Sequence, residues 1–459
     1  MCAADRNPVA ASTRATGLSS LDWLICAVVA LGFLFDTFEI IVMPVTVRPA
    51  LISLGVAPGT PVFSWWVGTL LYAPAGIAGL FGIAGGYLID RYGRRRIVVF
   101  SLLLYGASTL GGAAATSPAG LLAARCVTLI GVSLEFIAAI TWLAELFPEP
   151  ERRERVLGYS QIASGVGNFA VTGTYYAAVT FAAQLPALNG HHDAWRYTLA
   201  AGFIPSIPLL LVRPWLPESP LWKLARTQSE LRRPGPRLLL APALRHVTIV
   251  STLLTACVYA SAYGVLQQAP RLVPALPDVR ALPSLRQEQL VSTVHFFGSL
   301  GEVAGRLLLA LLVVHVVSQR RLLRLFMIPA LIVVPIGFVY ASTAGVAALK
   351  AASFIGTLLV IAQFSFLGNY LPRLFPTALR GMGESLAVNI GGRVLGTSAA
   401  FMTPQLVGLV PDTDPARQLA IAMAITAVSV LGLGAVLTAW MPEPASQRLP
   451  DTVEQPQTT

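Results

Sequence analysis

Long apolar blocks recur along this sequence and restrict it to very few folds. Each block is close to the roughly 20 residues that an α-helix needs to cross the hydrocarbon core of a bilayer. Strands that cross a membrane are shorter and alternate apolar with polar residues. Hydrophobic residues make up 55% of the chain and charged residues only 12%, too few to cover the surface of a water-soluble protein of 459 residues. The sequence therefore predicts an all-α integral membrane protein.

The apolar blocks predict twelve transmembrane helices. We place them at 21–47, 62–88, 96–115, 118–145, 156–184, 196–215, 246–269, 289–315, 322–342, 344–371, 378–408 and 417–440. The longest polar stretch between spans, 216–245, is predicted to be a cytoplasmic linker between two six-helix bundles at 21–215 and 246–440. Tails at 1–20 and 441–459 complete the chain. The first tail has no cleavable signal pattern, so we expect the first block to remain as a membrane helix.

The basic residues indicate the orientation of the chain. With both termini in the cytoplasm, 22 Lys and Arg residues fall in cytoplasmic segments and seven in external ones. This asymmetry is what the positive-inside rule expects. The net charge of +10 is therefore interpreted as a topology signal, and we expect no nucleic-acid partner. We expect a monomer embedded in the lipid bilayer of a cell (inner) membrane.

The two predicted halves share a sequence repeat. The segment ELFPEPERRERVLG begins at Glu145, and RLFPTALRGMG begins 228 residues later at Arg373. The same offset places Arg94–Arg96 on Leu322–Arg324. A duplicated bundle is typical of secondary transporters, which bind their substrate between the halves, near the membrane midplane.

The most specific motif is GYLIDRYGRRR, Gly86–Arg96, between the second and third predicted spans. Gly86 lets two helices approach each other, and Gly93 permits a tight turn. Asp90 can accept hydrogen bonds from a helix N-terminus or pair with an arginine. The motif resembles, without a departure, the loop signature of the major facilitator superfamily.

Other segments extend this resemblance over nearly the whole chain outside the tails. Arg125, Glu145 and Arg153 are spaced as in sugar porters and their relatives, and Tyr370–Arg393 resembles the junction of the tenth and eleventh helices of the family. The stretch WRY…RPWLPESPLW resembles the end of its sixth helix. Two features depart from the pattern: the second copy of the loop signature is degenerate, and Arg373 stands where relatives carry a glutamate. These departures leave the symmetry of the gating contacts open.

The resemblance implies a set of gating residues near the cytoplasmic loops. We assign this role to Gly86, Asp90, Arg91, Gly93, Arg94, Arg95, Glu145, Arg153, Glu218 and Arg380. Because these residues lie away from the membrane midplane, we expect them to act on the motion of the two halves and not on substrate binding.

Charged residues inside the spans point to a functional cavity. Each costs about 2.5–3.5 kcal/mol at the centre of a membrane helix when it is unpaired, so such residues line cavities and have partners. They are Asp36, Glu39, Arg125, Glu135, Glu302, Arg306 and Arg393. The family geometry brings the first helix against the fourth, so we predict that Asp36 pairs with Arg125.

The same residues suggest how protons are coupled to transport. The segment FDTFEI, Phe35–Ile40, resembles the Asp-x-x-Asp of aromatic-acid and phosphate proton symporters, and Glu135 matches an acid of metabolite and phosphate proton symporters. A carboxyl group in a dry cavity holds its proton near neutral pH, whereas a nearby guanidinium expels it. We therefore predict that Asp36 carries the coupling proton and that Arg125 sets its release, with Glu135 as the next candidate.

Polar residues in the spans suggest a substrate site. The candidates are Glu39, Gln161, Tyr263, Gln267, Asn389 and Arg393. Gln161 matches a glutamine that contacts substrate in sugar porters. Arg393 has no acid within two turns of its own helix, which favours an anion ligand because a guanidinium donates two parallel hydrogen bonds to a carboxylate. Alternatively, Arg393 caps helix carbonyls or pairs with an acid on another span.

These features together predict a secondary active transporter that moves a small metabolite, an organic anion, by alternating access and proton-coupled symport. Three alternatives remain open: sugar-porter-like uptake of a neutral solute, proton-driven drug efflux, and a membrane receptor that does not transport. The chain has no serine elbow, zinc-protease motif or nucleotide-binding loop, so we expect no enzyme and no cofactor. The single His191–Asp193 cluster is weak evidence for a metal, and we predict none.

Overall fold

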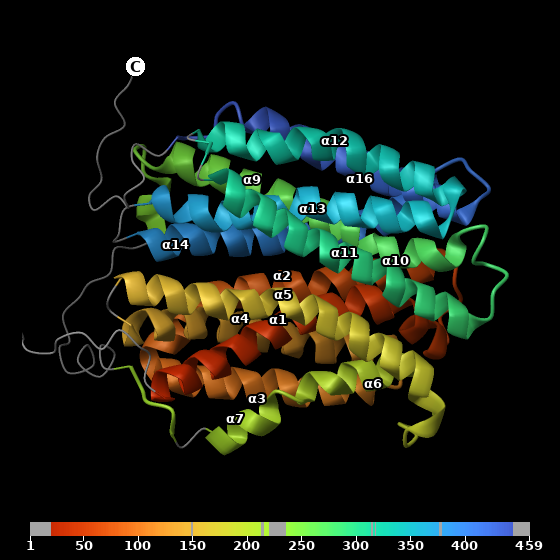
Figure 1. Cartoon of the computed structure of the whole chain (residues 1–459), viewed down its shortest axis with the longest axis horizontal. Helices are drawn as coiled ribbons and strands as arrows, with labels where there is room; N and C mark the ends of the chain where they lie inside the picture. Colours follow the sequence, from red (N-terminus) through yellow and green to blue (C-terminus); the bar gives the residue numbers. More distant parts are fainter. Residues whose placement is uncertain are drawn as a thin grey trace, which may run out of the picture.

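The computed structural model describes residues 20–147, 150–212, 215–219, 236–313, 315–316, 318–375 and 379–443. In this part of the chain, long helices lie roughly side by side and form an elongated bundle (Figure 1). Nine of them are long and apolar enough to cross a membrane. The described structure is therefore all-α in its regular elements, as the apolar blocks predict.

The first group of helices covers the first six predicted spans. Its elements are α1 (Ser20–Ser53), α2 (Pro61–Tyr92), α3 (Arg94–Ala113), α4 (Pro118–Leu146), α5 (Pro150–Phe181), α6 (Ala194–Ala200) and α7 (Ser206–Val212). Sequence signals fix two of the helix starts. Helix α2 begins with a proline after Thr60, whose hydroxyl accepts the Phe63 N–H, and α4 begins in the same way after Ser117.

The second group covers the last six predicted spans. Its elements are α9 (Arg245–Gly264), α10 (Ala269–Leu272), α11 (Ser284–Val313), α12 (Gln319–Ala344), α13 (Val346–Tyr370), α14 (Arg380–Ser385), the π-helical segment η8 (Leu386–Leu395), α15 (Ala399–Leu406) and α16 (Pro415–Leu437). Every predicted span therefore coincides with helical structure, but some of them, including the sixth and the eleventh, are interrupted. The sixth span is divided into α6 and α7, with Pro205 between them, and the eleventh into α14, η8 and α15.

The two groups lie against each other along the length of the bundle (Figure 1). Helices α2 and α5 of the first group contact η8, α15 and α11 of the second. We call the end where α2 finishes and α3 begins the linker end, and the opposite end, where α1 finishes, the far end. The exact division of the chain at 216–245 stays a prediction, because 220–235 lie outside the described residues.

Candidate functional site

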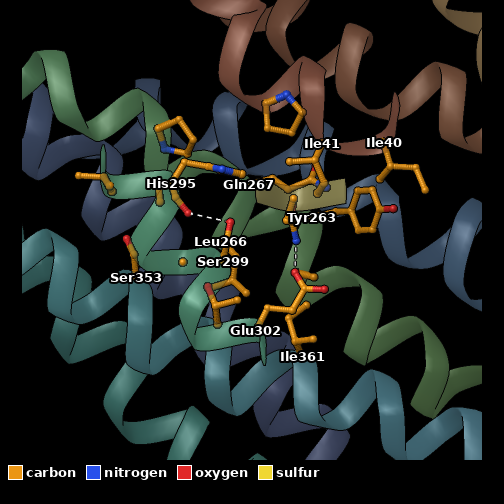
Figure 2. Close-up of a pocket in the computed structure, with 18 of the residues that line it drawn as sticks. Ile40, Ile41, Tyr263, Leu266, Gln267, His295, Ser299, Glu302, Ser353 and Ile361 are labelled. Carbon is orange, nitrogen blue, oxygen red and sulfur yellow. Dashed lines mark hydrogen bonds between the residues drawn. The ribbon is translucent and has the colours of Figure 1, made fainter. Parts of the chain in front are cut away.

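A cavity of about 200 Å³ lies between the two groups of helices, lined from α1 and α5 on one side and from α9, α11 and α13 on the other. Figure 2 shows Tyr263, Gln267, His295 and Glu302 around it. Tyr263 and Gln267 are thus among the predicted substrate residues that the structure places at the cavity. Its apolar walls with a few convergent polar groups are typical of a small-molecule site.

An ion pair lies in the wall of this cavity. Arg306 Nη2 is 2.6 Å from Glu302 Oε1, one turn away on α11, while the side-chain amide of Asn168 on α5 donates to the other carboxylate oxygen. The Glu302 side chain is 7% exposed, whereas that of Arg306 is 38% exposed. The guanidinium of Arg306 is therefore the charged group of the pair that remains open to a ligand.

Helices α5 and α11 are joined by further hydrogen bonds toward the far end. The Thr172 hydroxyl lies 2.7 Å from His295 Nδ1, and the Tyr175 hydroxyl donates to Glu288 at 2.6 Å. Arg48 of α1 also reaches Glu288, at 3.3 Å. These contacts connect the first group of helices to the second at successive turns, from the cavity outward.

The contact between α5 and α11 has a signal in the sequence that the prediction of the cavity left out. The signal is the spacing of three polar residues on α11: Glu288, His295 and Glu302. They recur at intervals of seven residues, which places them on one face of a helix. Polar groups along one face of an otherwise apolar membrane helix indicate a face turned toward protein.

The buried charges of the first group are arranged differently from the prediction. Arg125 Nη1 lies 2.6 Å from Glu39 Oε2, and a second guanidinium nitrogen donates to the Glu39 carbonyl. The expected pairing of Arg125 with Asp36 is therefore corrected to Glu39. Asp36 and Glu39 are three residues apart on α1, so the rotation of α1 against α4 decides which acid meets Arg125, and sequence spacing does not. Glu39, fully buried in this pair, is not among the residues that line the cavity.

Asp36 and Glu135 form a second buried cluster. Their side chains lie within hydrogen-bonding reach of each other, and both residues are buried. In the described part of the chain, no N–H or O–H group donates to either carboxyl group. The Glu135 carboxyl packs directly on Gly32 of α1, where any side chain would collide with it. Two carboxyl groups without a donor are satisfied when they share a proton.

The two remaining predicted substrate residues of the eleventh span turn toward the first group of helices. Arg393 on η8 donates to the hydroxyl of Ser133 on α4, and Asn389 packs against Gly82 of α2. Neither residue lines the cavity in the described structure. The reason is that α2 approaches η8 closely at Gly79 and Gly82, which leaves the two side chains facing α2 and α4.

The predicted gating residues meet at the linker end. Arg94 Nη2 is 3.0 Å from Glu145 Oε1, and the other oxygen of Glu145 accepts from Ser219 at 2.5 Å. Glu218 Oε1 accepts the backbone N–H groups of Arg94 and Arg95 at 3.0 and 3.1 Å, and so caps the start of α3. The same network links α3 and α4 to the residues that directly follow the sixth predicted span.

The loop between α2 and α3 has the tight turn that the motif requires. Gly93 has φ 99°, a conformation that L side chains rarely adopt, and Arg91 lies over the Tyr92 ring. The remaining predicted residues cannot be assigned contacts, because their side chains lie outside the described part of the chain: Gly86, Asp90, Arg153, Gln161 and Arg380.

A bundle of membrane-length helices in two groups, with a largely apolar cavity between them that a few polar and charged groups line, is typical of a secondary transporter. The family model of the Major Facilitator Superfamily matches residues 25–400, and the chain belongs to this family. The predictions of family, of a transporter and of a protein that is not an enzyme are thereby confirmed.

Curated relatives agree with this assignment. An arabinose-proton symporter of Bacillus subtilis (strain 168) is 30% identical over 159 residues, 34% of this chain and 33% of the relative. The chain thus spans about a third of the length of that relative. A sialic acid transporter of Escherichia coli (strain K12) is 22% identical over 373 residues, which are 79% of this chain and 82% of the length of the relative. The relatives of this chain therefore include a sugar-proton symporter and a transporter of an acidic metabolite.

A solved structure supports the fold. The crystal structure of a D-xylose-proton symporter matches with a TM-score of 0.72 and 20% identity, covering 93% of this chain and 99% of that one. At this identity the match supports the fold alone. It confirms the predicted fold class, twelve transmembrane helices in two six-helix bundles.

Proposed function

We propose that this transporter moves a small organic anion together with protons, binding the anion in the cavity between α5 and α11. The observation that carries the proposal is the partly exposed guanidinium of Arg306 in the cavity wall. A substrate carboxylate can take the place of Glu302 as its partner, because a guanidinium forms parallel hydrogen bonds with any carboxylate. A relative matched over most of its length, a transporter of sialic acid, supports the same substrate class.

The proton component rests on the cluster of Asp36 and Glu135. Two adjacent carboxyl groups cannot both stay ionised in a dry environment, so the pair is suited to bind and release one proton. The first relatives by similarity, which include an arabinose-proton symporter, support coupling to protons. In this proposal Arg125, held by Glu39, has a structural role next to the proton site.

A neutral solute is the second candidate. Glu302 already neutralises Arg306, and the rest of the lining offers the hydroxyl and amide groups of Tyr263, Gln267 and Ser299. Such groups suit a sugar, whose hydroxyls donate and accept hydrogen bonds. The two candidates differ in one respect: only the anion requires the positive charge of Arg306.

Uptake by the purified protein in proteoliposomes tests the function. With a pH gradient imposed, we expect labelled organic acids to accumulate and neutral sugars not to. Arg306→Gln should abolish binding of the acid, and Arg306→Lys should weaken it less. Accumulation of a sugar by both the wild type and Arg306→Gln would replace the organic anion with a neutral substrate.

The proton site is tested in the same vesicles. Asp36→Asn should abolish accumulation driven by the pH gradient but keep the exchange of internal for external substrate, since exchange needs no net proton movement. Glu135→Gln is the paired variant, because the two acids share one site. If Asp36→Asn still concentrates substrate against its gradient, Asp36 does not carry the proton.

A further inference from the structure

Among the predicted substrate residues whose side chains the structure describes, Arg393 is the one that forms a hydrogen bond from the second group of helices to the first. It comes from η8, a π-helical segment of ten residues, Leu386–Leu395. Its guanidinium donates to the hydroxyl of Ser133, which itself donates to the carbonyl of Ala78 on α2 at 3.1 Å. Segments of π-helix are frequent at functional sites because they displace side chains from the regular helical positions.

The backbone at Arg393 packs closely against α2. A methyl group placed on Gly79 would lie 2.8 Å from the Arg393 Cβ and 2.9 Å from the Asn389 carbonyl oxygen. The absence of a side chain at Gly79 therefore lets η8 approach α2 at this level. From this position the guanidinium of Arg393 reaches Ser133 on α4, two residues before Glu135.

The charge that Arg393 meets there is that of Asp36 and Glu135. Arg393 is close enough to Asp36 for the two charges to attract each other, and Asp36 lies beside Glu135. Two other charged groups face this cluster, Glu39 and Arg125, but they form an ion pair and contribute little net charge. The remaining titratable groups nearby in the described structure are phenols. Tyr105 is buried and has no hydrogen-bond partner there, and Tyr259 and Tyr263 lie near Arg393 itself.

We propose that Arg393 is the residue through which the second group of helices responds to the protonation of Asp36 and Glu135. When the acids are ionised, they attract Arg393 and hold η8 against α4. When they bind a proton, this attraction falls and the two groups separate more readily. The inference rests on the proposed coupling to protons and adds the residue that converts proton binding into motion between the halves.

This role also explains why Arg393 is poorly placed as a ligand for substrate. Its guanidinium donates to Ser133, and the cavity is lined by other residues. A charged residue that couples protonation to the motion of two groups of helices has to lie where the groups contact each other. It also has to interact with a group whose charge changes. Arg393 meets both conditions, because its donor bond joins the two groups of helices and its neighbours are titratable.

The distance between the two groups at the far end measures this response without any substrate. Ala57, in the loop between α1 and α2, and Ala281, just before α11, are both exposed and lie on different groups. Spin labels at these two positions, in a chain whose four native cysteines are replaced by alanine, report the separation by pulsed electron resonance. In the wild type we expect the population with a wide far end to rise on the order of fivefold between pH 8 and pH 5.

Variants of Arg393 decide whether this residue carries the effect. Arg393→Gln should show the wide population at both pH values, because the electrostatic interaction is absent whatever the charge of the acids. Arg393→Lys, the matched control that keeps the charge, should retain a pH response. A response in Arg393→Gln equal to that of the wild type would overturn the inference.

A variant of the two acids tests the same electrostatic interaction with Arg393 unchanged. Asp36→Asn combined with Glu135→Gln should fix the distance distribution at its wide form, and it provides the test if Arg393→Gln does not fold. A pH response that survives in this double variant would equally contradict the inference. If the wild type itself shows no pH response and no proton-driven uptake, the proposed coupling to protons is what fails.

Discussion

The ion pair of Glu39 and Arg125 shows how individual residues tolerate the membrane interior. Both side chains are almost fully inaccessible, and Arg125 makes two contacts with Glu39, one through the carboxylate and one through the backbone carbonyl. The Glu39 carboxylate packs directly on Gly202, which lies between α6 and α7. Any side chain at position 202 would collide with it. The pair thus binds α1 to α4 and to the sixth predicted span.

Removal of one partner should leave the other charge buried and uncompensated. For Glu39→Gln we expect a loss of about 3–5 kcal/mol in the free energy of unfolding, measured by thermal unfolding in detergent. Arg417→Gln is the control, because the Arg417 side chain is 54% exposed in its pair with Asp412 and should change the stability by about 1 kcal/mol or less. An equal melting temperature for Glu39→Gln and the wild type would contradict the structural role of the pair.

At the scale of elements, close approach between helices depends on particular glycines. Helix α11 packs against α13 at Gly301, where any side chain would collide with the backbone carbonyl of Phe354. One turn earlier, a methyl group on Gly298 would have only the Thr357 hydroxyl nearby, at 3.5 Å. Small residues allow such contacts between membrane helices, whose association depends on tight packing.

The two glycines provide a matched pair for a test. Gly301→Ala should destabilise the protein by about 1–3 kcal/mol, because the backbone of α13 has to move to admit the methyl group. Gly298→Ala should leave the stability nearly unchanged, since the space exists. Thermal unfolding and the yield of monodisperse protein measure both, and equal behaviour of the two variants would show that α11 and α13 are not packed as described.

At the scale of the whole molecule, the two groups of helices have to move relative to each other. The described hydrogen bonds between them extend from the far end to the middle: Arg48 and Tyr175 to Glu288, Thr172 to His295, Asn168 to Glu302 and Arg393 to Ser133. Alternating access requires that such contacts break in turn on the two sides of the substrate site. The polar contacts of α11 with α1 and α5, together with the contact of Arg393 with α4, therefore have to break when the far end opens.

The orientation of the molecule in the membrane is a separate prediction. The excess of Lys and Arg in the tails, the linker and the even-numbered loops places the linker end in the cytoplasm. Reporter fusions after Arg232 and at the C-terminus should both give a cytoplasmic signal. A periplasmic signal at either position would reverse or change the proposed topology.

Much of this architecture could be predicted from residue patterns alone. The lengths of the apolar blocks indicated every transmembrane segment. A chain in lipid has to satisfy its backbone hydrogen bonds within a helix, and a helix needs about 20 residues to cross the bilayer. The motif Gly86–Arg96 indicated the family, and Glu302 with Arg306 could be paired from their spacing of four residues. The π-helical segment η8 in the eleventh span was not predicted from the sequence.

Sequence by itself determined which charges lie in the membrane, since each stands inside an apolar block, but it did not determine their partners. Asp36 and Glu39 are three residues apart on α1, so by spacing either acid could pair with Arg125. The rotation of α1 against α4 decides that Glu39 forms the ion pair and that Asp36 lies beside Glu135. Likewise, Arg393 belongs to the eleventh span by sequence, whereas the approach of α2 at Gly79 directed it to Ser133 and away from the cavity. Periodicity specifies the faces of one helix. Which faces meet is decided by packing between helices that are distant in sequence, and this packing exists only in the tertiary structure.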